Sequence, residues 1–141
     1  MYKISTRGQY ALLIMTDLAE HGTENFVPVK ILSHSRNLSV KYLEQILIQL
    51  GKAGLVIGSR GSNGGYKLNK KASEYTAGEI LRAMEGDLCP RSPSEKPYLV
   101  SLATENFWTD FEKEVNSFVD SVTLEELAEK NRNFVGFEYC I

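Results

Sequence analysis

One amphipathic segment, residues 39–53, constrains the fold of this chain most. Four apolar residues recur at helical spacing along it: Leu43, Ile46, Leu47 and Leu50. Ser39 offers the side-chain acceptor that a helix N-terminus needs, and Leu38 and Leu43 have the spacing of a hydrophobic staple. The opposite side of the segment is polar. It therefore predicts a helix that packs on a body along one side and presents hydrogen-bonding groups along the other.

Two further helices are predicted before this segment and a hairpin after it. Residues 8–21 carry an apolar stripe, with Thr6 as the expected N-cap and Gly22 as the stop. Pro28 opens a shorter helix that runs through His34, since proline suits a first helical turn. The glycine-rich run 60–65 separates apolar residues 55–57 from alternating residues 66–68. That pattern predicts a β-hairpin.

Three short helices followed by a glycine-rich hairpin are the element order of a winged helix-turn-helix. A major groove about 12 Å wide admits one α-helix, and the 39–53 helix has the apolar and polar sides that docking requires. Glu44 can accept from a cytosine amine, Gln45 can pair with adenine, and Arg60 at the hairpin tip suits a narrow minor groove. The basic residues suited to phosphates are Lys3, Arg7, Lys41 and Lys52. The pattern alone also fits a helical hairpin whose polar side binds nothing.

Charge is distributed unevenly along the chain. The formal net charge of −2 argues weakly against a nucleic-acid partner. Residues 1–71, however, carry ten Lys or Arg and four Asp or Glu, whereas residues 72–141 carry six and fourteen. The two halves therefore have net charges of +6 and −8. A basic half favours contact with a polyanion, and a chance split between two solvated halves is the alternative.

The second half of the chain is predicted to be mostly helical. Thr76 opens a helix that runs through Glu85, and a loop with three prolines follows over residues 86–97. Residues 98–122 form the longest predicted helix, and Thr123 starts a final short helix before the apolar tail 134–141. The long helix carries an aromatic stripe with few partners in so small a domain, which favours a homodimer interface. Packing of the stripe on its own domain is the alternative. The stripe comprises Phe107, Phe111, Val115 and Phe118.

Motifs in six segments together resemble the IscR/NsrR/CymR family of bacterial winged helix-turn-helix regulators. These segments are residues 3–10, 38–45, 54–56, 60–66, 76–80 and 123–127. The resemblance covers nearly the whole chain. It implies a mainly α (α+β) fold, with a winged helix-turn-helix domain over residues 1–86 and a two-stranded wing. Residues 87–97 would be the loop that holds the sensor in this family. Residues 98–141 would form a long dimerisation helix, a short helix and an aromatic tail.

The resemblance also implies a homodimeric repressor that binds a palindromic operator in double-stranded DNA. The 39–53 helix would be the recognition helix, and the hairpin would be the wing. On all these grounds we expect ten DNA-binding residues: Lys3, Thr6, Arg7, Ser39, Lys41, Tyr42, Glu44, Gln45, Arg60 and Gly61.

The expected sensor loop departs from the pattern of family members that hold an iron–sulfur cluster on three cysteines. It contains only Cys89, and the other cysteine, Cys140, lies in the tail. We therefore expect no cofactor, with Cys89 as a candidate redox-sensing thiol. This arrangement is more similar to the CymR-like branch, which represses genes of cysteine and sulfur metabolism together with cysteine synthase. Ile141 is accordingly a candidate docking residue for cysteine synthase, and packing of the tail on the dimer is the alternative.

Other function classes lack their sequence signals. No apolar run approaches the ~20 residues of a membrane-spanning helix, and the first residues lack a secretory apolar region, so we expect a cytoplasmic protein. We also expect no enzyme, because the chain has no P-loop, no HExxH motif and no recognisable catalytic triad. Two alternatives stay open. One is a winged-helix protein-interaction module, and the other is an iron–sulfur or redox-sensing regulator of the same family.

Overall fold

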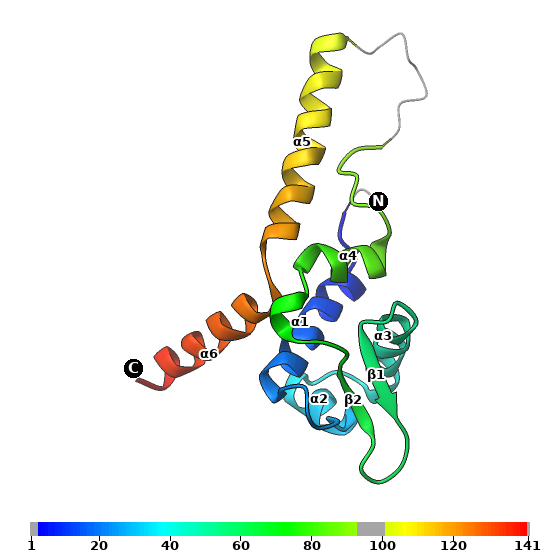
Figure 1. The fold of residues 1–141 in the computed structure, drawn as a ribbon, viewed down its shortest axis with the longest axis vertical. Coiled ribbons are helices and arrows are strands. Elements are labelled where there is room, and N and C mark those ends of the chain that lie inside the picture. The colour runs from blue at the N-terminus through cyan, green and yellow to red at the C-terminus, as the bar shows by residue number, and fades with distance from the viewer. Residues whose placement is uncertain (1–2, 93–100, 141) are drawn as a thin grey trace.

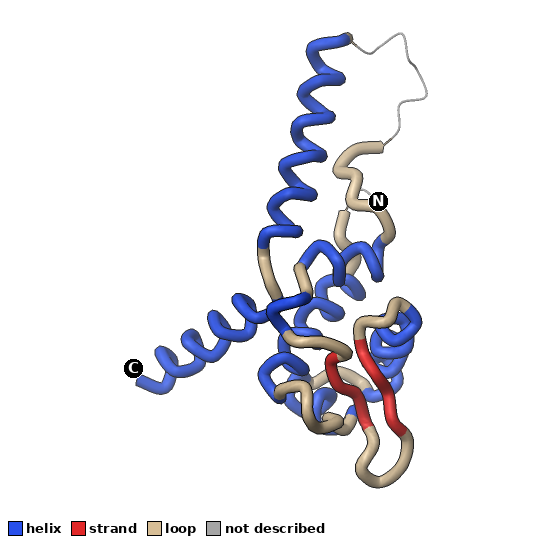
Figure 2. Tube along the Cα trace, viewed as in Figure 1, coloured by secondary structure: helices blue, strands red, loops and turns tan. Residues whose placement is uncertain are grey.

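The computed structural model describes residues 3–92 and 101–140. Its elements are α1 (Thr6–His21), α2 (Val29–Arg36), α3 (Val40–Lys52), β1 (Val56–Ser59), β2 (Gly65–Leu68), the 3-10 helix η1 (Ala72–Glu74), α4 (Ala77–Glu85), α5 (Leu102–Ser121) and α6 (Leu124–Cys140). The two strands pair antiparallel, with Val56 opposite Leu68 and Ser59 opposite Gly65. The predicted mainly α winged helix-turn-helix with a two-stranded wing is confirmed (Figure 2).

The hairpin and α5 extend from opposite ends of the molecule. Helices α1 to α4 form the body, the hairpin projects at one end, and α5 rises from the other (Figure 1). Helix α6 leaves the body sideways, after burying Leu124 and Ala128 near its start. At about 1.5 Å per residue, the 20 residues of α5 extend roughly 30 Å. No helix in the described part of the chain is long and apolar enough to cross a membrane.

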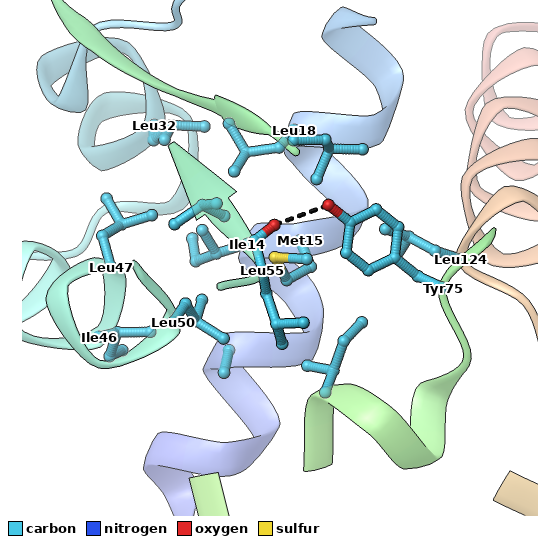
Figure 3. Close-up of a cluster of buried hydrophobic side chains, with 14 of the residues drawn as sticks. Ile14, Met15, Leu18, Leu32, Ile46, Leu47, Leu50, Leu55, Tyr75 and Leu124 are labelled. Atoms are coloured by element: carbon cyan, nitrogen blue, oxygen red, sulfur yellow. Dashed lines mark hydrogen bonds between the residues drawn. The ribbon is translucent and has the colours of Figure 1, made fainter. Parts of the chain in front are cut away.

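One apolar core joins the helices of the body. Ile14, Met15 and Leu18 of α1 lie close to the buried stripe of α3, and Leu32 of α2 joins them (Figure 3). The later part of the chain adds Tyr75 and Leu124 to the same cluster. The helical spacing that predicted stripes on α1 and α3 thus identified two of the faces that meet in this core.

Ser5 caps α1, so the expectation that Thr6 does so is wrong. The Ser5 hydroxyl accepts from the Gly8 N–H at 3.0 Å. The Glu85 carboxylate of α4 accepts from the Ser5 N–H at 2.8 Å and from its hydroxyl at 2.5 Å. Serine and threonine share capping chemistry, so the local sequence did not separate the two positions. The distant contact with Glu85 distinguishes them.

Helix α5 is shorter than predicted. It begins at Leu102 rather than Tyr98, because Ser101 and Thr104 form a capping box with N–H···O distances of 3.2 and 3.3 Å. Residues 98–100 lie outside the described residues. The helix ends at Ser121, one residue before the predicted boundary, since Val122 has extended backbone.

Helix α6 is longer than predicted. The expected short helix and separate tail form one helix that continues to Cys140. Residues 134–140 are therefore helical, and Ile141 lies outside the described residues. The residue before this helix, Thr123, forms a bridge with Thr76, and the Leu124 N–H donates to the Tyr75 carbonyl at 3.0 Å. These bonds attach the start of α6 to the body.

Candidate DNA interface

Helix α3 has a buried side and an exposed side. The four residues of its apolar stripe are fully buried. Its exposed residues are Val40, Lys41, Glu44, Gln45, Ile48, Gly51 and Lys52. Ser39 caps the helix as predicted, because its hydroxyl accepts from the Tyr42 N–H at 3.1 Å. The exposed side therefore presents an ammonium, a carboxylate and an amide within two turns, which can donate to and accept from a polar surface.

A groove lies between α2, the first turns of α3, and the hairpin. Its lining includes Lys30 of α2, Val40 and Glu44 of α3, and Ser59, Gly61 and Ser62 of the hairpin. The Val27 N–H donates to the Tyr66 carbonyl at 2.8 Å, and the Tyr66 N–H donates back at 3.0 Å. A Cβ on Gly65 would overlap the Val27 carbonyl, so only glycine permits this close approach. The bridge holds the hairpin beside α2 and thereby defines the groove.

Arg7 connects α1 to the other side of α3. Its Nη2 donates to the Gln45 carbonyl at 3.1 Å, and its Nε is buried without a hydrogen-bond partner among the described residues. The hollow beside it is lined by Gln45, Ile48, Gln49 and Lys52. Part of the Arg7 guanidinium is thus committed to holding α3. Its role in phosphate contact remains a prediction.

The other predicted residues lie at the ends of these elements. Lys3 and Thr6 are exposed at the start of α1, and Arg60 and Gly61 are exposed at the hairpin tip. Tyr42 is half-buried and packs edge-on against Tyr10, with ring centroids 6.0 Å apart. The structure thus brings Glu44 and the hairpin into one groove, and Gln45 beside Arg7. Sequence reasoning missed Lys30 as a groove residue. The available signal was its place two residues after Pro28, in the first turn of the predicted helix.

Two contacts hold the helices of this interface in place. Asp17 is 5% exposed, and its carboxylate accepts from Arg36 Nε at 2.8 Å and Nη2 at 2.5 Å, which joins α1 to α2. The hydrogen bond with Asp17 raises the pKa of Arg36. The Gln49 amide donates to the carbonyls of Ala83 and Met84 at 3.3 and 3.4 Å, which joins α3 to α4.

Helix α5 exposes an aromatic surface. Phe107 is 57% exposed and Phe118 is 68% exposed, and α5 has no buried residue. Phe107, Trp108 and Phe111 also form a cluster, with ring centroids 5.0 to 6.1 Å apart. Val115, the fourth residue of the predicted stripe, is half-buried. A helix of this length with exposed aromatic rings leaves a large apolar area in contact with water.

The polar side of α5 is tied to its own chain. Arg82 donates to both Asp120 carboxylate oxygens, at 2.7 and 2.9 Å, and to Asn116 Oδ1 at 2.7 Å. The hydrogen bond with Arg82 holds the pKa of Asp120 below its ordinary value. A Cβ on Gly78 would meet Asp120, so glycine allows α4 and α5 to approach. Farther along α5, Arg91 donates to Glu105 at 2.8 and 2.5 Å, which lowers the pKa of Glu105.

Cys89 lies between the end of α4 and α5. Its Sγ is 3.5 Å from the Arg91 carbonyl oxygen and 3.6 Å from Glu112 Oε2. An iron–sulfur cluster is held by several ligands, most often thiolates. Within residues 3–92 and 101–140, no three His, Cys, Asp or Glu residues are grouped so that they could hold a metal ion. The neighbours of Cys89 therefore do not fit a cluster held by several thiolates of this loop.

Comparisons with known proteins agree with this geometry. Residues 4–130 match the Rrf2 family, described as an iron-dependent transcriptional regulator. The chain is 41% identical over 126 residues to the HTH-type transcriptional regulator CymR of Bacillus subtilis, and the match covers 89% of each chain. It is 33% identical to the regulator IscR of Aliivibrio salmonicida, over 92% of this chain and 79% of that one. The structure resembles that of CymR, the global cysteine regulator of B. subtilis, with a TM-score of 0.82, 39% identity, and coverage of 92% and 98%.

Proposed function

The chain belongs to the Rrf2 family of helix-turn-helix transcriptional regulators, and from this premise we propose that it is a homodimeric repressor that binds a palindromic operator. The observation that carries the proposal is the division of α3 into a fully buried apolar side and an exposed side that borders the hairpin groove. A recognition helix needs this division to sit on its domain and still enter a major groove.

In this proposal α3 reads bases and the flanking elements contact the backbone. Glu44 accepts from a cytosine amine, Gln45 pairs with adenine, and Arg60 at the hairpin tip enters the minor groove. The backbone contacts come from Lys3, Thr6, Arg7, Ser39, Lys41, Tyr42 and Gly61, with Lys30 added by its place in the groove. The hydrogen bond from Arg7 to the Gln45 carbonyl supports this assignment of base and backbone contacts, because it anchors α3 beside the residues predicted to contact phosphates.

The exposed aromatic surface of α5 supports a homodimer. Arg82 binds the side of α5 that carries Asp120, and Arg91 pairs with Glu105 and lies over the Trp108 ring. Phe107 and Phe118 stay exposed and are left for a partner. A second copy offers an identical surface, and two-fold pairing places two recognition helices on one duplex. Such a dimer reads two half-sites, which is why we propose a palindromic operator.

We propose genes of cysteine and sulfur metabolism as the targets. The support is the similarity to CymR of B. subtilis, described as a global cysteine regulator. Cysteine synthase as a partner and Ile141 as its docking residue remain predictions, as does redox sensing by Cys89. Deleting Ile141 should abolish co-purification with cysteine synthase, and unchanged binding would contradict the docking prediction.

Binding to promoter fragments at increasing salt tests the proposed function. A dimer that neutralises several phosphates should bind more weakly as salt increases. A plot of log Kd against the logarithm of salt concentration should be linear, with a slope of roughly one unit per neutralised phosphate. Lys41→Ala should reduce that slope by about one for each recognition helix. Glu44→Ala should instead relax selectivity at one base pair in each half-site. Glu129→Ala on α6 is the matched control and should change neither. Absence of salt-dependent binding to any fragment would favour a protein-interaction module.

A further inference from the structure

Val40 is the first residue of α3, and the core does not explain its presence there. It is 38% exposed and lines the groove between α2, α3 and the hairpin. Valine is a poorer helix former than alanine, so helix propensity does not favour it at this position either. Glu44 lies one turn farther along and lines the same groove.

The surroundings of Val40 limit what can cover it. Four residues of the same groove are polar or charged: Lys30, Glu44, Ser59 and Ser62. Its other large apolar residues, Pro28, Val29 and Tyr66, are half-buried, so Val40 is the exposed apolar side chain of the lining. A protein partner that docks by apolar contact needs a larger continuous exposed patch than one exposed valine beside half-buried neighbours. On the major-groove edges of the four base pairs, the apolar group is the C5-methyl of thymine.

We propose that Val40 selects thymine at one position of each operator half-site by packing against its C5-methyl group. This inference rests on the proposed DNA-binding function and adds a residue that determines sequence specificity. Residues four apart on a helix are separated by about 6 Å along its axis, and stacked bases by about 3.4 Å. The thymine should therefore lie within about two base pairs of the base pair that Glu44 reads.

Replacing thymine with deoxyuridine tests the contact, because uracil differs from thymine only by the absence of the methyl group. A preferred duplex is first selected from a randomised pool, and each thymine in it is then replaced singly. We expect one position per half-site where the replacement weakens binding of the natural chain about fourfold, the effect of about 0.8 kcal/mol for one buried carbon. Replacing both symmetric positions should weaken binding about fifteenfold.

Two variants separate this contact from a general effect on folding. Val40→Ala should bind the thymine duplex more weakly than the natural chain does. The ratio of its affinities for the thymine and the uracil duplex at that position should fall below about twofold. Ile31→Ala removes a 50% exposed side chain of α2 outside the groove lining and should keep the fourfold ratio. Circular dichroism should show equal helix content for both variants.

Each result distinguishes this inference from the proposed function. If the natural chain selects a duplex but no thymine is sensitive, or if Val40→Ala keeps the full ratio, the role of Val40 is refuted and DNA binding stands. The role of Val40 is also refuted if the thymine whose replacement weakens binding lies more than about two base pairs from the base pair at which Glu44→Ala loses selectivity. If no duplex is selected at all, the proposed function fails, and the Val40 inference fails with it.

Discussion

Replacing Tyr75 with phenylalanine should destabilise the body without changing its shape. Tyr75 is wholly buried, and its hydroxyl donates to the Leu55 carbonyl at 2.7 Å. It also accepts from the N–H groups of Asn69 and Lys70 at 2.8 and 3.2 Å. In Tyr75→Phe the buried Leu55 carbonyl loses this donor, which costs about 1–3 kcal/mol. Water can replace the hydroxyl at the two N–H groups, which are nearer the surface.

The free energy of unfolding measures this effect. We expect Tyr75→Phe to lower it by about 1–3 kcal/mol in urea, which corresponds to a Tm decrease of roughly 3–12 °C for a chain of this length. All variants are compared at one protein concentration, because self-association stabilises the folded state by mass action. Tyr10→Phe is the matched control. The Tyr10 hydroxyl makes no hydrogen bond within the described part of the chain, so its removal should cost less than about 0.5 kcal/mol.

The same variant has a pH signature. Burial raises the pKa of Tyr75 above its ordinary value of 10.0. A group whose pKa is higher in the folded than in the unfolded protein makes its full contribution to stability at any pH below its pKa in the unfolded protein. That contribution is lost as the pH rises through its pKa in the folded protein. The stability difference between the natural chain and Tyr75→Phe should therefore be constant below about pH 10 and should narrow above it. A difference under about 0.5 kcal/mol at pH 7, or one that does not narrow above pH 10, would refute the reasoning.

Three further substitutions, one of them with a matched control, probe the contacts between helices. Asp17→Asn should lower the free energy of unfolding by about 2–4 kcal/mol, because it leaves Arg36 beside a buried neutral amide. Urea denaturation measures this loss. A loss below about 1 kcal/mol is the size expected for an exposed ion pair and would contradict the prediction. Gly78→Ala should destabilise by about 1–3 kcal/mol, since its Cβ would meet α5, whereas Gly51→Ala should be neutral or stabilising, with its nearest neighbour at 3.9 Å; equal Tm values would contradict this. Asp120→Asn should lower Tm at pH 7. This Tm loss should fade as the pH falls through the lowered pKa of Asp120, because the natural carboxylate then protonates. A Tm loss that persists at pH 2 would contradict the prediction.

The parts of the fold that depend on neighbouring residues were predicted correctly. The Ser39 cap, the buried stripe of α3 and the antiparallel hairpin all depend on spacings of a few residues. Helix ends were less predictable, because Ser5 and Thr6 offer the same cap and only Glu85 distinguishes them. The length of α6 was missed because an apolar tail has no local stop signal that separates helix from extended chain.

The sequence by itself determined where α1 to α4 and the hairpin form, which side of α3 is buried, and that the first half of the chain is basic. Only the tertiary structure decided what stands beside that helix. The hairpin is fixed against α2 by the bridge between Val27 and Tyr66, and this bridge places Ser59 and Gly61 in one groove with Lys30 and Val40. The hairpin residues are far from Lys30 in the chain, so no local spacing relates them. The groove exists because the buried core and a few long-range hydrogen bonds bring its three walls together.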